Sequence, residues 1–182
     1  MPAALLRQFD VQTVAAVSSV TGRSSTLDRT VAALAEHLAK VHVVLLGALI
    51  VGGSGALRRR HRETALRIGL VLPLTIAVVG VVGASIGRTR PFVGRAGPPL
   101  VDHRPGRSFP SRHAACAAAM ATVALRGAPR IGQAMAMLGA VLAASRVYAG
   151  LHYPSDVVGG WAIGVGLGML VRQREATGAF VG

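Results

Sequence analysis

Long apolar runs separated by short polar segments dominate the chain from residue 41 onward. Two runs, residues 41–57 and 68–86, have the length and composition of membrane-spanning helices. The second contains Pro73, which a membrane helix tolerates when neighbouring groups satisfy the freed carbonyl. Three further runs are shorter and rich in Ala and Gly, and they cover approximately residues 113–125, 131–144 and 157–171. The pattern predicts an all-α integral-membrane helix bundle of about five spans.

The first 40 residues follow a different pattern, in which polar and apolar positions alternate at helical spacing. Apolar residues recur in this way between residues 9 and 17, and a second such segment covers residues 27–38. No cleavable signal peptide is evident. We expect an amphipathic helical hairpin that lies at the membrane interface. The whole chain, residues 1–182, is then a single membrane-embedded domain, with the hairpin in residues 1–40 and the bundle in residues 41–172.

Composition and charge limit the classes of molecule that the chain is expected to bind. Hydrophobic residues make up 52% of the chain and charged residues 15%, which excludes a disordered or fibrous protein. The net charge of +13 would suggest nucleic acid in a soluble protein. Here nearly all the cations are arginines in short segments between apolar runs, where they meet lipid headgroups or a phosphorylated ligand. We therefore expect a bilayer and a lipid phosphate as partners, and no nucleic acid.

Polar residues gather where apolar runs begin or end, and there an unpaired ionisable group would be costly. Arg88 and Arg90 follow the run that ends near Ile86, at the start of a long, proline-rich connection over residues 87–110. Asp102 and His103 lie later in the same connection, and we interpret both as parts of a solvated turn. The other two clusters open helices: Ser111, Arg112 and His113 open one, and Ser145, Arg146, His152 and Asp156 lead into the other.

Two helix N-termini that each carry a histidine, together with arginines from three segments, are typical of an anion site. Free N–H groups and the helix dipole favour a phosphate, and arginine forks bind its oxygens in pairs. Of two imidazoles that reach one phosphate, one can attack phosphorus while the other protonates the leaving oxygen. Asp156, four residues after His152, can orient that ring. No set of acids and histidines has convincing metal-ligand spacing, so we expect no metal.

These residues resemble the type-2 phosphatidic acid phosphatase superfamily. Its signature has three parts: Lys, six residues and Arg-Pro; then Pro-Ser-Gly-His; then Ser-Arg, five residues, His, three residues and Asp. The third part is complete here. The second departs from the signature at Arg112, which replaces Gly, and the first departs at Gly83, which stands at the Lys position. The matched residues are Arg90 and Pro91, then Pro110, Ser111 and His113, and then Ser145, Arg146, His152 and Asp156.

The resemblance implies metal-independent hydrolysis of a phosphate ester or anhydride through a phosphohistidine, without a cofactor. It implies His152 as the nucleophile, Asp156 as its orienting partner and His113 as the general acid. Either Arg88 or Arg112 could supply the charge of the missing Lys. The implied phosphate-binding residues are Arg90, Arg146, Ser111, Ser145, Arg112 and Arg88.

Within the superfamily, the sequence of residues 90–114 resembles the bacterial undecaprenyl-diphosphate phosphatase branch, although that branch often has Asp where Arg112 stands. A phosphatidylglycerophosphate or polyprenyl-phosphosugar phosphatase stays open, as does a non-catalytic phospholipid-binding protein. A vanadium haloperoxidase shares the site pattern but is long and soluble. The count of cations on the two sides of the membrane does not by itself decide the orientation. With the cations that the site requires left out, it favours a bacterial cell-membrane protein whose active site faces outward, and residues 58–62 are interpreted as a cytoplasmic basic loop. The sequence leaves the oligomeric state open.

Overall fold

The computed structural model describes residues 2–93 and 99–171. Within those ranges the chain is helical, with no strand and one isolated bridge between Thr89 and Arg107, so the all-α prediction is confirmed. The helices are α1 (Pro2–Val20), α2 (Ser25–Val51), α3 (Gly55–Ile86), α4 (Arg112–Gly127), α5 (Pro129–Tyr148) and α6 (Pro154–Leu170).

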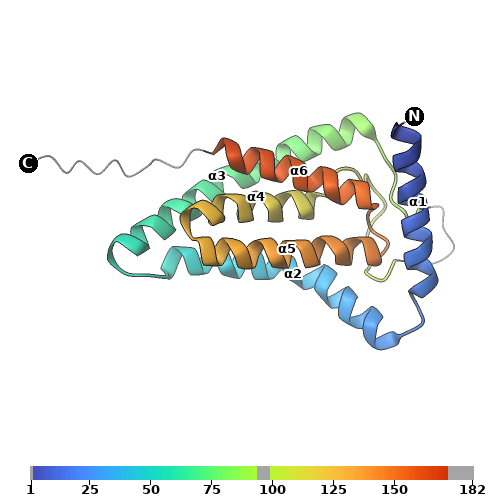
Figure 1. Cartoon of the computed structure of the whole chain (residues 1–182), viewed down its shortest axis with the longest axis horizontal. Coiled ribbons are helices and arrows are strands. Elements are labelled where there is room, and N and C mark those ends of the chain that lie inside the picture. Colours follow the sequence, from blue (N-terminus) through green and yellow to red (C-terminus); the bar gives the residue numbers. More distant parts are fainter. Residues whose placement is uncertain (1, 94–98, 172–182) are drawn as a thin grey trace, which may run out of the picture.

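Helix α4 forms the centre of the bundle. It packs against α3, α5 and α6, while α2 covers α3 and α5 (Figure 1). Ten of the sixteen residues of α4 are buried, and most of these are alanines. Helix α1 lies across one end of the bundle, where it contacts α5 and α6. The connections from α3 to α4 and from α5 to α6 meet at this same end.

Small residues let α4 and α6 approach each other closely. Gly160, Gly164 and Gly168 form one stripe along α6, and a Cβ added at Gly164 would lie 2.1 Å from the carbonyl oxygen of Ala115. Only glycine fits at such a distance, because a carbon and an oxygen that do not bond stay more than 3 Å apart. This close contact aligns the N-termini of the two helices, and the Ser111 N–H donates to the Asp156 carbonyl at 2.8 Å.

Among residues 2–93 and 99–171, three helices, α2, α3 and α5, are long and apolar enough to cross a membrane. Large apolar side chains cover the outside of the bundle, and Val44, Leu66 and Leu70 each expose about 70% of their surface. Such a surface requires a lipid environment rather than water. The chain is therefore an integral membrane protein. Helices α4 and α6 are shorter than these three, and about five spans remains the prediction.

Three segment boundaries differ from the sequence interpretation. Helix α2 continues through residue 40, so the expected second hairpin helix and residues 41–51 of the first apolar run form one element. The predicted span over residues 41–57 is not one helix, because the chain turns at residues 52–54, where Gly53 has a positive φ of 82°, and residues 55–57 belong to α3. The basic cluster at residues 58–62 is helical rather than a loop, because α3 begins at Gly55. Arg60 donates to the Arg126 carbonyl at 3.1 Å, which places this cluster at the end of the bundle opposite α1 (Figure 1). The end of the predicted bundle, at residue 172, lies outside the described residues.

Candidate active site

A cavity of about 480 Å³ opens at the end of the bundle where α1 lies. One wall is apolar and comes from α3, at Ile76, Val79 and Gly80. The remaining described lining is strongly cationic and includes no acid. It contains four arginines and three histidines, namely Arg90, Arg107, Arg112, Arg146, His103, His113 and His152. A cavity with this lining is suited to a multiply charged anion attached to an apolar group.

Two stretches of the α3–α4 connection pair with each other and carry arginines into the site. The Ser108 N–H donates to the Arg88 carbonyl at 2.7 Å, next to the bridge between Thr89 and Arg107. Residues two apart in an extended segment project to the same side. Arg88 and Arg90 accordingly both face the residues around α6, with Arg90 at the imidazole of His152 and Arg88 at the carboxylate of Asp156.

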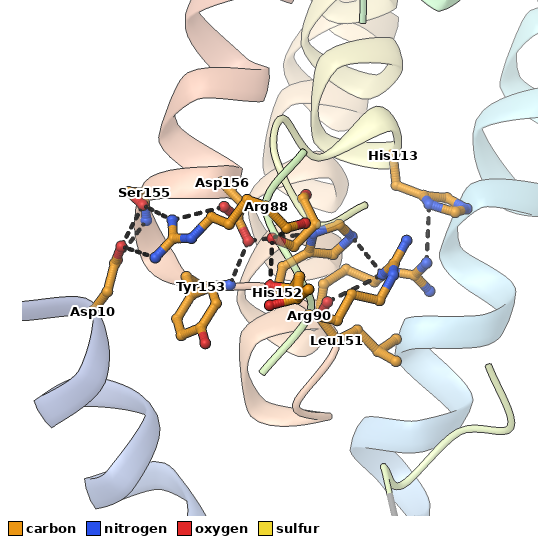
Figure 2. Close-up of polar contacts among 12 residues, drawn as sticks. Asp10, Arg88, Arg90, His113, Leu151, His152, Tyr153, Ser155 and Asp156 are labelled. Carbon is orange, nitrogen blue, oxygen red and sulfur yellow. Dashed lines mark hydrogen bonds and ion pairs between the residues drawn. The ribbon is translucent and has the colours of Figure 1, made fainter. Parts of the chain in front are cut away.

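The hydrogen bonds of His152 determine which of its nitrogens faces the cavity. Nδ1 lies 2.8 Å from the Ser108 carbonyl oxygen, and because that oxygen can only accept, Nδ1 carries the proton. Nε2 is then unprotonated, and it lies 3.3 Å from Nη1 of Arg90 (Figure 2). His152 is only 2% exposed. The ring thus presents a nucleophilic lone pair to the cavity from a fixed position.

His113 holds the opposite tautomer. Its Nδ1 lies 3.0 Å from Nη2 of Arg146, and since arginine can only donate, Nδ1 accepts and the ring proton is on Nε2. Arg146 is 4% exposed and also donates to the Ala35 carbonyl, which fixes its guanidinium between α2 and α4. The cavity therefore contains one imidazole whose unprotonated Nε2 accepts from Arg90 and one with an N–H to donate.

Asp156 lies behind His152 in the first turn of α6 and is fully buried. Its Oδ2 accepts from the Tyr153 N–H at 2.8 Å and is 3.7 Å from Nδ1 of His152, which is beyond hydrogen-bond distance. Its Oδ1 accepts from Nη1 of Arg88 at 2.9 Å. The tautomer of His152 is thus set by the Ser108 carbonyl, and Asp156 acts on the ring as a nearby negative charge.

The structure does not bring every residue in the predicted phosphate-binding set to the cavity. Arg88 is outside the lining and contacts acids instead. Ser145 donates to the Leu142 carbonyl within α5 and does not line the cavity. Ser111 precedes α4 and is buried outside the lining, and its hydroxyl has no hydrogen-bond partner among the described residues. The three that do line the cavity, as the sequence predicts, are Arg90, Arg112 and Arg146.

Two lining residues, Arg107 and His103, were not in the predicted set. Arg107 lies next to Gly83, the residue at the Lys position of the motif. A Cβ added at Gly83 would lie 3.8 Å from Cδ of Arg107, so the Arg107 side chain occupies the space beside that position. The absence of Lys at Gly83 was the sequence signal that another cation is needed. Its source required the fold, because Gly83 and Arg107 are far apart in the chain. His103 was interpreted as part of a solvated turn, and the structure corrects this.

Burial and positive charge favour neutral imidazoles here. The pKa of His152 is lowered from 6.5, chiefly by burial, with Arg90 and Arg146 adding to the effect and Asp156 opposing it. The pKa of His103 falls to about 4, again chiefly by burial and then by the charges of Arg90 and Arg146. Burial also lowers the pKa of Arg90. These effects favour the unprotonated form of His152 at neutral pH.

The chain is similar in sequence and fold to several known proteins. A family profile described as the PAP2 superfamily matches residues 64–177. The chain is 27% identical over 157 residues to undecaprenyl-diphosphatase BcrC of Bacillus subtilis, a match that covers 85% of this chain and 78% of the relative. It is 35% identical over 121 residues to an undecaprenyl-diphosphatase of Sulfolobus acidocaldarius, a match that covers 64% and 59%. The crystal structure of Aquifex aeolicus LpxE has the same fold, with a TM-score of 0.65 at 22% identity over 93% of each chain.

Proposed function

The chain belongs to the PAP2 superfamily, and we propose that it is a membrane lipid phosphatase that hydrolyses a polyprenyl diphosphate of the undecaprenyl type. One observation carries the proposal: a histidine with an unprotonated Nε2 and a histidine with a donor N–H line the same arginine-rich cavity. The names of the curated relatives support the substrate class.

The reaction follows from the two tautomers. Nε2 of His152 attacks the terminal phosphorus and forms a phosphohistidine, while Arg90 and Arg146 bind the phosphoryl oxygens and stabilise the charge that develops on them. The negative charge of the bound phosphate favours the imidazolium form of His113, which takes up a second proton from solvent and then gives a proton to the leaving oxygen of the lipid, returning to the neutral ring. Water then attacks the phosphohistidine, with His113 accepting its proton, and inorganic phosphate is released.

The layout of the cations supports a diphosphate over a monophosphate. Arg146 is buried at the inner end of the cavity beside the two catalytic histidines, whereas Arg107 and Arg112 are exposed at its mouth. A terminal phosphate at His152 would leave the second phosphate of a diphosphate within reach of the outer pair. A monophosphate would leave that pair without a ligand charge.

The purified protein in detergent tests the proposal against polyprenyl diphosphate, phosphatidylglycerophosphate and phosphatidate. We expect phosphate release to be fastest from the diphosphate, to survive EDTA, to be inhibited by vanadate and to be lost in His152→Ala. The matched control is His37→Ala, because His37 is exposed on α2 and outside the cavity. Lipid binding without phosphate release would support a non-catalytic protein, and preference for another lipid would replace the substrate named above.

We also propose that the cavity faces the outside of a bacterial cell membrane. The basic cluster of α3 and Arg126 lie at the opposite end of the bundle (Figure 1), and lysines and arginines favour the cytoplasmic side. Two single-cysteine variants in a Cys116→Ser background, Ser54→Cys and Asp102→Cys, test the orientation. A membrane-impermeant maleimide added to whole cells should label only the variant at position 102, and labelling only at position 54 would reverse the orientation.

A further inference from the structure

Helix α1 carries a buried carboxylate on the face that meets the bundle. Asp10 is only 1% exposed, whereas the neighbouring Leu6 and Phe9 each expose more than half of their surface. A buried carboxylate without partners costs several kcal/mol, so its contacts require an explanation. The hydrogen bonds of its side chain all go to Arg88 and Ser155, which lie next to Asp156 on the side away from the cavity.

The partners of Asp10 lie in two distant segments. Its Oδ2 accepts from Nη2 of Arg88 at 2.7 Å, and its Oδ1 accepts from the N–H of Ser155 at 3.0 Å (Figure 2). The hydroxyl of Ser155 donates to Oδ2 as well. Ser155 directly precedes Asp156, so α1 is attached to the first turn of α6, which holds Asp156.

Arg88 connects Asp10 to Asp156. One end of its guanidinium, Nη2, binds Asp10, and the other, Nη1, donates to Oδ1 of Asp156 at 2.9 Å and to the Ser155 hydroxyl at 2.7 Å. The guanidinium lies over the Tyr153 ring, with Cζ 3.9 Å from the ring centroid. A planar fork fixed at three points holds its partners in one geometry.

We propose that Asp10 is a positioning residue of the active site, acting through Arg88 to hold Asp156 beside His152. The assignment rests on the catalytic role proposed above for His152. A row of polar contacts starts on α1 and ends at the proposed nucleophile: Asp10 binds Arg88, Arg88 binds Asp156, and Asp156 lies beside His152. Helix α1 is therefore part of the catalytic apparatus as well as a surface helix.

The division of Arg88 between two acids explains why Asp10 matters. Without the Asp10 charge, the whole fork is available to Asp156, and a bidentate pair with Arg88 would draw the carboxylate away from the ring. Asp156 would then stabilise the positive charge that develops on the His152 ring less effectively. Asp10 thus keeps one end of the Arg88 fork occupied, so that Arg88 holds Asp156 through Oδ1 alone and leaves Oδ2 beside the ring.

The proposal predicts that the pKa of His152 shifts in opposite directions when Asp10 and Arg88 are replaced. On the other side from the cavity the ring faces Asp156, with Arg88 and Asp10 behind. Removing the negative charge of Asp10 should lower the pKa of His152, and removing the positive charge of Arg88 should raise it. Loss of packing alone would not move the two variants in opposite directions. The other titratable and charged groups that line the cavity are His103, His113, Arg90, Arg107, Arg112 and Arg146.

The test compares Asp10→Asn and Arg88→Gln with the wild-type full-length protein in detergent. We expect kcat to fall about tenfold in each, as for other residues that orient an active-site group, with KM changed less than about twofold. The acid limb of kcat/KM should move to lower pH in Asp10→Asn and to higher pH in Arg88→Gln. Asp28→Asn is the control, since the Asp28 carboxylate also accepts two hydrogen bonds, from the Gly22 N–H after α1 and from the Tyr148 hydroxyl of α5, but lies outside the cavity.

Unchanged kcat and pH profile in Asp10→Asn, or an equal loss in Asp28→Asn, would overturn the proposal. If Asp10→Asn does not fold, Arg88→Lys tests the same link between Asp10 and Asp156. One ammonium keeps the charge of Arg88 but cannot bind both acids as the guanidinium does, so kcat should fall while the acid limb of kcat/KM stays in place. The His152 titration, followed by NMR on protein with labelled histidine and assigned with His152→Ala, needs no turnover. It should show the same opposite shifts even if the substrate proposed above is wrong.

Discussion

Nη2 of Arg146 donates to Nδ1 of His113 at 3.0 Å, and this one contact joins α5 to the first turn of α4 across the cavity. It leaves the ring proton of His113 on Nε2 and keeps a buried cation beside the position proposed for the phosphate. The same guanidinium is therefore placed to bind the substrate and to set the tautomer of the proposed general acid.

Replacing His113 should affect substrates according to their leaving group. In His113→Ala we expect kcat to fall about 10²- to 10⁴-fold for the polyprenyl diphosphate, the range typical of a lost general acid. An activated aryl phosphate, whose leaving oxygen needs no proton, should lose much less. Steady-state rates with both substrates check this, with His37→Ala as control. Equal losses on both would contradict the role of His113 in proton transfer.

The pH profile should report the neutral nucleophile. Since burial lowers the pKa of His152 below 6.5, the ring stays unprotonated to lower pH than an exposed histidine, and kcat/KM should be lost only as the pH falls through that lowered pKa. The acid limb is therefore expected below pH 6.5. Two substrates with different phosphate pKa values should share it; a limb that follows the substrate would contradict this assignment.

Arg107 should matter for diphosphates. In Arg107→Gln we expect KM for the polyprenyl diphosphate to rise about fivefold, which corresponds to about 1 kcal/mol for a contact at the cavity mouth. KM for a polyprenyl monophosphate should change little. Arg104→Gln is the matched control, because Arg104 is exposed in the same connection but does not line the cavity. The same rise for both substrates would argue against an outer phosphate position.

Gly164 should be needed for the contact between α4 and α6. Gly164→Ala places a methyl group against the Ala115 carbonyl, and we expect a loss of about 1–3 kcal/mol from overpacking. Gly166→Ala, two residues away with nothing within 4 Å of its added Cβ, should leave stability unchanged or slightly raised. Thermal unfolding in detergent measures both. Equal stability of the two variants would show that the helices can separate without cost.

Local sequence patterns predicted much of the helical architecture. The last three apolar runs correspond to α4, α5 and α6, because helix-opening prolines and serines and the ends of apolar runs are local signals. The joining of residues 27–38 with the next run was missed, since no helix-breaking residue separates them and the boundary was inferred from polarity alone. The helical conformation of the basic cluster at residues 58–62 was missed for a similar reason, because arginine is a good helix former.

The sequence by itself determined which chemistry is available: two histidines, an acid and several arginines placed at helix ends by motif spacing. Only the tertiary structure decided which cations share the cavity. Arg107 enters it beside Gly83, while Arg88 turns to Asp10 and Asp156. Those choices depend on contacts between segments far apart in the chain, where the partners available to a guanidinium are set by packing of whole helices and cannot be deduced from its neighbours in sequence.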